Sequence, residues 1–199
     1  MNKFVIVSGS HKINGLSDRV AAHLADLVTG HLPDREANVV SLAALPFWDE
    51  GMWGEPSLIE NWNAWGPMAD TLRAADALIV ISPEYGGMVP PRLANFFLLC
   101  SGKEIGHKPA LAVGVSASRG GAYPITQLRS YAYKNNHVCW IPDHLIVRNV
   151  DAELNLLAED SYEGQFALYC VRLLDAYASA LRTVRQCGVV DHETYPYGM

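Results

Sequence analysis

The sequence predicts an α/β protein in which helices cover both faces of a five-stranded parallel sheet. Short apolar runs alternate five times with segments of helical periodicity along the 199 residues. The run at residues 77–81 is apolar throughout, which is typical of parallel strands that are covered on both faces. Strands that alternate with helices in this way form βαβ units. No break in composition suggests a second domain, so we expect residues 1–199 to form one domain.

The strand-like and helix-like segments follow one another in a regular order. Strands are expected at residues 4–7, 39–42, 77–81, 110–115 and 138–141. Helices are expected at about residues 17–30, 57–75, 91–100, 122–136 and 162–187. Ser17 is a favourable N-cap residue for the first of these helices. In the last helix we expect a buried apolar stripe formed by Phe166, Tyr169, Leu173, Leu174, Tyr177 and Leu181.

Residues 46–67 are rich in tryptophan and also contain Pro, Gly and acidic residues; the tryptophans are Trp48, Trp53, Trp62 and Trp65. We expect a long loop there that leads into a helix. Two interpretations of the aromatic side chains stay open. They pack over the rim of the sheet, or they belong to a subunit interface or roof the active site together with Met88.

The composition indicates a globular protein and argues against nucleic-acid binding and membrane insertion. Half of the residues are apolar and 18% are charged, which is unlike a disordered chain. The formal charge is −6 and no basic run occurs, so a nucleic-acid partner is not expected. The N-terminus enters a strand pattern almost at once, so we expect neither a signal peptide nor a spanning segment, and we expect a cytoplasmic protein.

The cysteines and histidines show no spacing typical of a metal site. The four cysteines include no CxxC pair, and we expect them to be reduced thiols. The seven histidines include no HxH or HExxH motif. We therefore expect no dedicated metal site.

The loop at residues 8–17 joins the first strand to the N-terminus of a helix. Such a terminus offers unpaired N–H groups and the positive end of the helix dipole to an anion such as phosphate. Ser10 and Ser17 add hydroxyl donors, and Lys12 adds a cation. Taken alone, the same residues also fit an ordinary strand–helix connection with a serine cap.

The loop after the third strand reads Pro83-Glu84-Tyr85-Gly86-Gly87. Two glycines after an aromatic residue let the backbone approach a flat ligand closely. Tyr85 is expected to lie against such a ligand. Glu84 is interpreted as a structural carboxylate that holds the turn. A tight strand–helix turn is the alternative.

The loop after the fourth strand is the third that contains glycines, at residues 116–121. Ser116 is a small donor, Arg119 is a cation, and Gly120 and Gly121 give the backbone freedom. Taken alone, this loop also fits a plain helix entry. The carboxyl ends of parallel strands share one edge of a sheet, so we expect the three loops to form one ligand site.

Together the three loops resemble the NAD(P)H-dependent FMN reductase family, which includes quinone, chromate and azo-dye reductases. The resemblance runs from about residue 3 to residue 141. The best match is in the second loop and the helix that follows it, at Pro83, Glu84, Tyr85, Pro90, Leu93 and Asn95. The chain departs from the family pattern at Lys12, Gly86 and Ala94, where the family has Arg, Asn and Lys. Lysine keeps the charge of arginine but loses its bidentate geometry.

The resemblance implies a flavodoxin-like fold with strand order 2-1-3-4-5 and one non-covalent FMN. It implies that Ser10, Lys12 and Ser17 hold the phosphate, and that the loop from Pro83 to Gly87 holds the edge of the isoalloxazine. The loop from Ser116 to Gly121 would then close the far side.

The implied activity is hydride transfer from NADPH or NADH to the flavin, followed by reduction of a small acceptor in a ping-pong cycle. No side-chain acid or base is required, so no catalytic residue is named. The resemblance also implies a homodimer or homotetramer. Two other classes stay open: a flavodoxin-type electron carrier, and a flavin-free binding or regulatory protein on the same fold.

Overall fold

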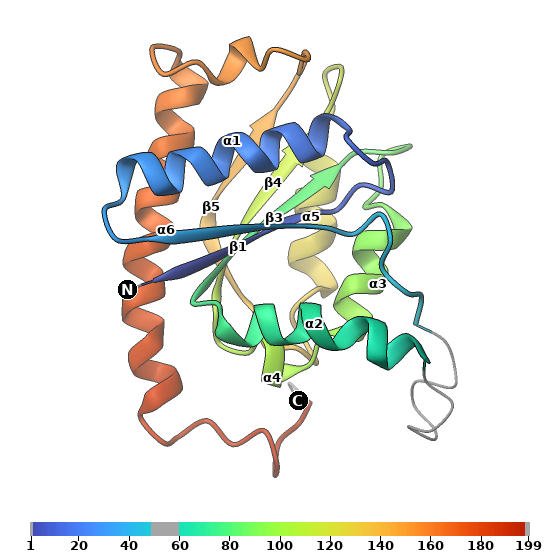
Figure 1. Cartoon of the computed structure of the whole chain (residues 1–199), viewed down its shortest axis with the longest axis vertical. Helices are drawn as coiled ribbons and strands as arrows, with labels where there is room; N and C mark the ends of the chain where they lie inside the picture. Colours follow the sequence, from blue (N-terminus) through green and yellow to red (C-terminus); the bar gives the residue numbers. More distant parts are fainter. Residues whose placement is uncertain (1, 49–59, 198–199) are drawn as a thin grey trace.

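The structure is a computed structural model that describes residues 2–48 and 60–197, and it contains the expected parallel sheet (Figure 1). The strands are β1 (Lys3–Ser8), β2 (Glu36–Ser41), β3 (Ala77–Pro83), β4 (Pro109–Val115) and β5 (Cys139–Val147). They pair in parallel in the order β2-β1-β3-β4-β5. The predicted fold class and strand order are therefore confirmed.

Helices cover both faces of this sheet. One face is covered by α1 (Leu16–His31) and α6 (Tyr162–Gln186), and the other by α2 (Glu60–Ala74), α3 (Pro91–Leu99) and α5 (Ala122–Tyr131). Alternate residues of β1 serve the two faces, because successive side chains of a strand point in opposite directions. Phe4 and Ile6 pack with α1 and α6, whereas Val5 and Val7 pack on the α2 side.

The first helix begins one residue before the expected N-cap. Its N-cap is Gly15 and not Ser17, and the carboxylate of Asp18, the third residue of the helix, accepts the Gly15 amide at 3.1 Å. Ser17 instead lies in the first turn and is buried. The helix also continues through Gly30 and ends at His31.

The fifth strand is longer than expected and the helix before it is shorter. α5 ends at Tyr131 and not near residue 136, and β5 continues to Val147. The pairing of β4 with β5 is interrupted by a bulge at residues 141–143. The Arg129 guanidinium satisfies the carbonyl groups of these three bulged residues, at 2.8, 2.5 and 3.2 Å, so the strand resumes after the interruption.

The buried stripe of α6 differs from the predicted one. Of the predicted residues only Leu174 is fully buried, and Tyr169 is 50% exposed. The buried side is formed mainly by small residues, which are Gly164, Ala167, Cys170, Val171, Leu174 and Ala178. A Cβ atom at Gly164 would lie 2.0 Å from the Ala158 oxygen, so the helix start packs closer than a larger side chain allows. The large aromatic residues therefore lie along the border of the packed face.

Two short helices were not expected. α4 (Gly102–Ile105) follows α3, and η3 (Asn155–Leu157) precedes α6. α4 begins with a capping box. The Glu104 carboxylate accepts the Ser101 amide, and the Ser101 side chain accepts a backbone amide of the first turn. In the described part of the chain no helix has the length and apolar character needed to cross a membrane.

The Trp-rich segment is described in part. Trp65 of α2 is 3% exposed and meets Phe96 edge-on, with ring centroids 6.2 Å apart. Packing over the sheet therefore holds for this residue. Trp53 and the side chain of Trp62 lie outside the described residues.

Candidate functional site

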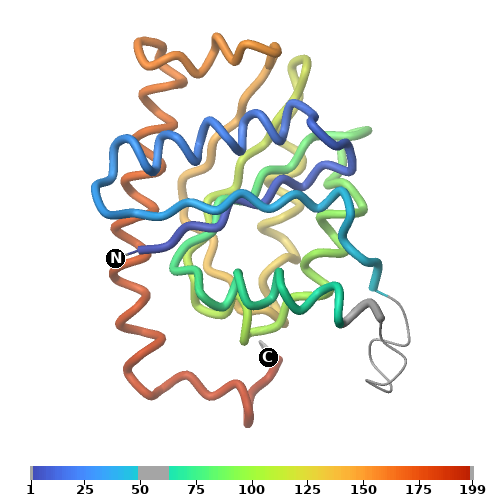
Figure 2. Tube along the Cα trace, viewed as in Figure 1, coloured from blue at the N-terminus to red at the C-terminus, as the bar shows by residue number. Residues whose placement is uncertain are grey.

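The three glycine-bearing loops lie next to one another because β1, β3 and β4 are consecutive in the sheet. Figure 2 shows the turns that follow these strands at the same edge, on the side away from the N-terminus. Hydrogen bonds join them directly. The Gly9 amide donates to Ile81 of β3 at 2.8 Å, and the Glu84 amide donates to Val115 of β4 at 3.0 Å. The expectation that the three loops meet at one edge agrees with the structure.

The first loop leaves most of its backbone N–H groups available. In the described part of the chain, six amides of this loop donate to no protein acceptor: those of Ser10, His11, Ile13, Asn14, Leu16 and Ser17. The last two belong to the first turn of α1, so the positive end of the helix dipole faces the same place. An anion at this position would meet a set of unpaired donors.

The hydroxyl groups of this loop differ in their partners. Ser17 is 3% exposed, and its hydroxyl group forms no hydrogen bond with any described residue. The Ser10 hydroxyl accepts the Lys12 amide at 3.0 Å and lies 3.2 Å from the Tyr85 hydroxyl. The side chain of Lys12 is exposed. Ser17 therefore offers an open donor, and Ser10 links the first loop to the second.

The second loop is a tight reversal centred on two glycines. Tyr85 and Met88 exchange backbone hydrogen bonds of 3.2 and 3.1 Å around Gly86 and Gly87. Both glycines have positive φ values, +59° and +79°, as a type I′ turn requires. Asparagine also tolerates this conformation, so the family's Asn and the Gly86 found here suit the same backbone. Within the described chain neither glycine amide has an acceptor.

Glu84 joins the second loop to the third. Its carboxylate accepts the Gly121 amide at 2.5 Å. A Cβ atom at Gly120 would lie 2.7 Å from the same carboxylate, so only glycine lets this contact form. The carboxylate is therefore occupied by the loop backbone, as expected of a residue that holds the turn.

The third loop is held by backbone contacts on both sides. The Ser116 amide donates to Val147 at 2.9 Å, and the Gly120 carbonyl accepts Arg148 at 3.0 Å. Gly121 has a φ of +105° and packs so closely on β4 that a Cβ atom at Gly114 would lie 2.1 Å from its oxygen. Arg119 is exposed and free to reach a ligand beyond the loop.

The three loops suit both ends of FMN, which are its phosphate and its flavin ring. A phosphate monoester needs several donors, which the open amides and Ser17 supply without a lysine-rich pocket. A flavin ring needs a flat approach to the backbone and donors at its polar edge, which the Gly86-Gly87 turn supplies. The assignment of these donors to the cofactor stays a prediction, and the sequence pattern did not single out Asp18. The signal was its position three residues after Gly15, where an acidic residue completes a helix cap.

Asn95 has a structural role that the resemblance alone did not define. Its side chain accepts the Trp48 amide at 2.6 Å and donates to Pro46 at 2.9 Å. Arg92, one turn earlier on α3, lies over the Phe47 ring with its guanidinium carbon 4.1 Å from the ring centroid. The start of the Trp-rich segment is thereby fixed to α3.

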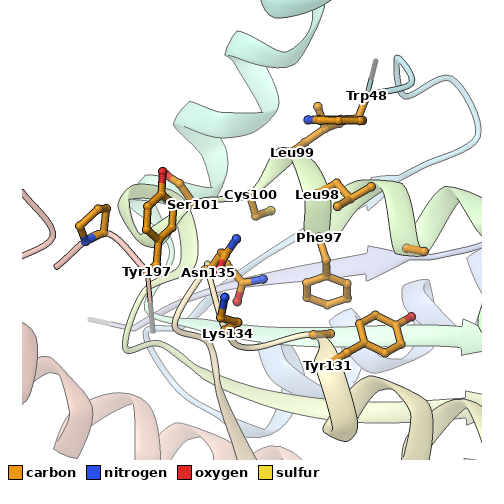
Figure 3. Close-up of a pocket in the computed structure, with 14 residues that line it drawn as sticks. Trp48, Phe97, Leu98, Leu99, Cys100, Ser101, Tyr131, Lys134, Asn135 and Tyr197 are labelled. Atoms are coloured by element: carbon orange, nitrogen blue, oxygen red, sulfur yellow. The ribbon is translucent and has the colours of Figure 1, made fainter. Parts of the chain in front are cut away.

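A cavity of about 550 Å³ lies apart from the three loops (Figure 3). Phe97, Leu98 and Cys100 from the end of α3 line one wall, and Tyr131 at the end of α5 lines the opposite one. None of the residues predicted to bind the cofactor contributes to it. The cavity is therefore separate from the site formed by the loops.

Comparison with known proteins identifies relatives over nearly the whole chain. An NADPH azoreductase from Bacillus sp. (strain OY1-2) is 25% identical over 189 residues, which are 94% of this chain and 99% of that protein. An NADH:FMN oxidoreductase, solved in its apo form, is 18% identical with a TM-score of 0.63 over 90% of each chain. The flavoenzyme FerB from Paracoccus denitrificans, an NAD(P)H:(acceptor) oxidoreductase, is 19% identical with a TM-score of 0.61 over 92% of this chain and 98% of its own.

The two solved structures have low sequence identities to this chain, so their similarity shows a shared fold and nothing more. The family itself is shown by a match of residues 2–152 to NADPH-dependent FMN reductases. FMN is accordingly the cofactor of this chain, and NAD(P)H is its co-substrate. The resemblance expected from the loops is confirmed, and the chain belongs to the NADPH-dependent FMN reductase family of NAD(P)H-dependent flavin oxidoreductases.

Proposed function

We propose that this enzyme reduces small acceptors such as quinones, azo compounds, free flavin or metal ions in a ping-pong cycle. The observation that carries the proposal is the meeting of three loops at one edge of the sheet, where the first two loops leave backbone amides without a protein acceptor. A flavin held there offers the same ring face first to the nicotinamide and then to the acceptor, so the two bind in turn. The similarity to an NADPH azoreductase over 94% of the chain supports an acceptor of this size.

We propose that the phosphate of FMN is bound by Ser10, Lys12 and Ser17 and by the open amides between them. Ser17, a residue that is 3% exposed, supplies a hydroxyl group without a protein partner, and Lys12 supplies charge from the exposed side. Each charge-assisted hydrogen bond contributes about 1.5–3 kcal/mol, so four or five of them are enough to retain the cofactor.

The remaining predicted residues position the ring. Pro83, Glu84 and Tyr85 lead into the turn at Gly86 and Gly87, whose unpaired amides can donate to the polar edge of the ring. Donors at this edge stabilise negative charge when the ring is reduced. Ser116, Arg119, Gly120 and Gly121 form the wall on the side of β4, and the Glu84 carboxylate keeps that wall in place.

When bound, FMN supplies the chemistry of hydride acceptance and onward electron transfer. The residues of the chain bind it, orient it and stabilise its charge, and no side chain of the site is required as a proton donor. Glu84 is already engaged with the Gly121 amide, which agrees with a positioning role.

The test is a visible spectrum of the purified protein followed by reduction with NADPH and with NADH. We expect a flavin spectrum that either nucleotide bleaches and that a quinone or azo dye restores, with parallel lines in double-reciprocal plots. Bleaching without steady turnover of any small acceptor would support the electron-carrier alternative. A colourless protein that takes up no added FMN would contradict the site proposed above.

We further propose that the chain forms a homo-oligomer through the surface of α3. The reason is exposed apolar area beside the cavity of Figure 3: Leu98 is 62% exposed and Tyr131 is 40% exposed. Light scattering of the enzyme and of Leu98→Asp tests this. The wild type is expected to be a dimer or tetramer and the variant a smaller species. A monomeric wild type would contradict the proposal.

A further inference from the structure

Three histidines that are far apart in the sequence meet at the edge of the sheet opposite the flavin site. His107 lies just before β4, His137 lies just before β5, and His192 follows α6. One ring nitrogen from each lies within 4.8 Å of the others. The ring centroids are 4.6 to 5.6 Å apart. The segment that follows α6 turns back toward α4 (Figure 1), and His192 belongs to this segment.

The backbone is shaped to bring these rings together. His107 and His137 both have positive φ values, +54° and +56°, which are uncommon for residues with a side chain. The His107 amide donates to the His137 carbonyl at 2.8 Å, so the two loops are joined at the cluster itself. Two strained residues that are bonded to each other at one place point to a local function.

The ring of His192 packs against two glycines, Gly102 and Gly106. Cβ atoms at Gly102 and Gly106 of the α4 region would lie 2.9 and 2.8 Å from the imidazole of His192. A side chain at Gly102 would meet the ring first, and one at Gly106 would also meet the Gly102 carbonyl oxygen, at 2.3 Å. Asp191 orders the adjoining chain, since its carboxylate accepts the amides of Glu193 and Thr194 at 3.1 and 2.9 Å.

We propose that His107, His137 and His192 bind one divalent transition-metal ion of the zinc class. Three imidazoles are a ligand set typical of Zn²⁺, and they also suit Ni²⁺ and Cu²⁺. Nitrogens that bind a tetrahedral zinc ion at its usual bond length are about 3.4 Å apart, so small side-chain rotations close the cluster. A water molecule would complete the coordination.

The charges around the cluster are balanced. The Arg185 guanidinium donates to the His107 carbonyl at 3.1 Å and places a positive charge nearby. Asp191 lies beside His192 and contributes the opposite charge. The histidines are half-buried, so an ion bound there would be partly shielded from water.

The ion would fasten the C-terminal segment to the sheet. The segment is otherwise held to His137 by a contact of 3.2 Å between the ring Nε2 and the Pro196 carbonyl. It also supplies Pro196 and Tyr197 to the cavity of Figure 3. Metal binding would therefore stabilise the enzyme and the shape of that cavity without contact to the flavin site.

The test is equilibrium dialysis of the EDTA-treated, FMN-loaded enzyme against ZnSO₄, with metal analysis of the retentate. We expect one equivalent of zinc to be retained by the wild type. His192→Gln is expected to weaken zinc binding about 100-fold, because one of three protein ligands is lost. His31→Gln removes a histidine outside the cluster and should leave zinc retention unchanged.

Thermal melting gives a second measurement that does not depend on catalysis. Zinc should raise the melting temperature of the wild type and of His31→Gln but not that of His192→Gln. Cleavage by a protease after α6 should also be slower with zinc in the wild type. Failure of the wild type to retain stoichiometric zinc, or equal retention by His192→Gln, would show that the rings only stack on one another.

Discussion

The carboxyl edge of the sheet leaves its polar groups open, whereas the amino edge pairs them with one another. Around the first loop, six amides and the Ser17 hydroxyl have no partner in the described chain. At the opposite edge, Asp76 pairs with Arg182 and Arg185 at 2.8 and 3.0 Å. Asp175 receives Arg35 in a two-pronged contact of 2.8 and 3.1 Å.

The difference shows which edge offers unpaired backbone donors to an anion. Unpaired donors cost stability unless water or a ligand satisfies them. A protein keeps such donors where binding requires them. The segments at the two ends of β1 differ in this respect: Ser10 and His11, after the strand, have amides without an acceptor, whereas Asn2, before it, donates to Asp175 at 2.7 Å and to Ser179 at 3.0 Å. Substitutions at the two edges should therefore have separable effects on stability and on FMN binding.

Asp76→Ala should give the largest loss of stability. Burial alone raises the pKa of Asp76, but the Arg182 hydrogen bond, the Lys3 amide and the two arginine charges lower it overall. Removal of the carboxylate leaves Arg185, which is 17% exposed, without its partner. We expect a loss of about 3 kcal/mol in the free energy of unfolding, measured with urea. FMN affinity of the folded protein should stay the same, and a parallel loss of FMN would contradict the separation of the two edges.

Ser17→Asp should have the opposite pattern. The new carboxylate would face the phosphate and repel it, so we expect FMN affinity to fall at least about 100-fold, or ~2.7 kcal/mol. An acidic residue in the first turn of a helix is favourable and offsets part of the cost of a larger, charged side chain at a position that is 3% exposed, so FMN affinity is measured on protein that circular dichroism shows to be folded. Ser17→Ala is the matched control and should lose about tenfold in affinity. If Ser17→Asp still copurifies with one FMN, the phosphate site is wrong.

Glu84→Ala tests the link between two loops of the open edge. The variant leaves the Gly121 amide without its charged acceptor, and we expect a loss of about 2 kcal/mol in unfolding free energy. Glu84→Gln keeps an acceptor oxygen and should recover more than half of this loss. FMN binding should weaken with Glu84→Ala and recover with Glu84→Gln. Equal behaviour of the two variants would indicate that the carboxylate does not hold the third loop.

The position of the open edge was predictable from the sequence, because parallel strands place their carboxyl ends together. The apolar runs predicted the strands, and Gly86 and Gly87 predicted the turn after β3. The N-cap of α1 was not predictable from Ser17 alone, since the helix start is fixed at Gly15 by the Asp18 carboxylate, which accepts the Gly15 amide and, at 2.5 Å, the Ser8 hydroxyl.

The ion pairs at the amino edge of the sheet could not be predicted from the sequence. Its pairs join residues separated by more than a hundred positions, such as Asp76 with Arg182. The three histidines are likewise brought together only by the return of the C-terminal segment, and no local spacing signals them. The predicted buried side of α6 was wrong because small residues pack against the sheet there. The large aromatic residues, whose spacing suggests an apolar stripe, lie beside them.

Lys108→Met should change how the free energy of unfolding depends on pH, because Lys108 is buried at the amino edge of the sheet. The Lys108 ammonium group donates to the carbonyl groups of Leu72 and Arg73 at 2.6 and 2.9 Å, at the end of α2. Burial, followed by the charge of Arg185, lowers the pKa of Lys108 to about 8 from 10.5. Between these values the unfolded chain binds more protons than the folded one, so this lysine makes stability rise with pH.

The useful quantity is the unfolding free energy of the wild type minus that of Lys108→Met. Below pH 8 it should be constant, because the lysine is protonated in both states. Above pH 8 it should rise by about 1 kcal/mol for each pH unit up to pH 10. Buried thiols and Tyr131 titrate in the same range with the opposite sign, but they are present in both proteins and cancel. A flat difference across this range would mean that the Lys108 ammonium group is not kept from water beneath α2.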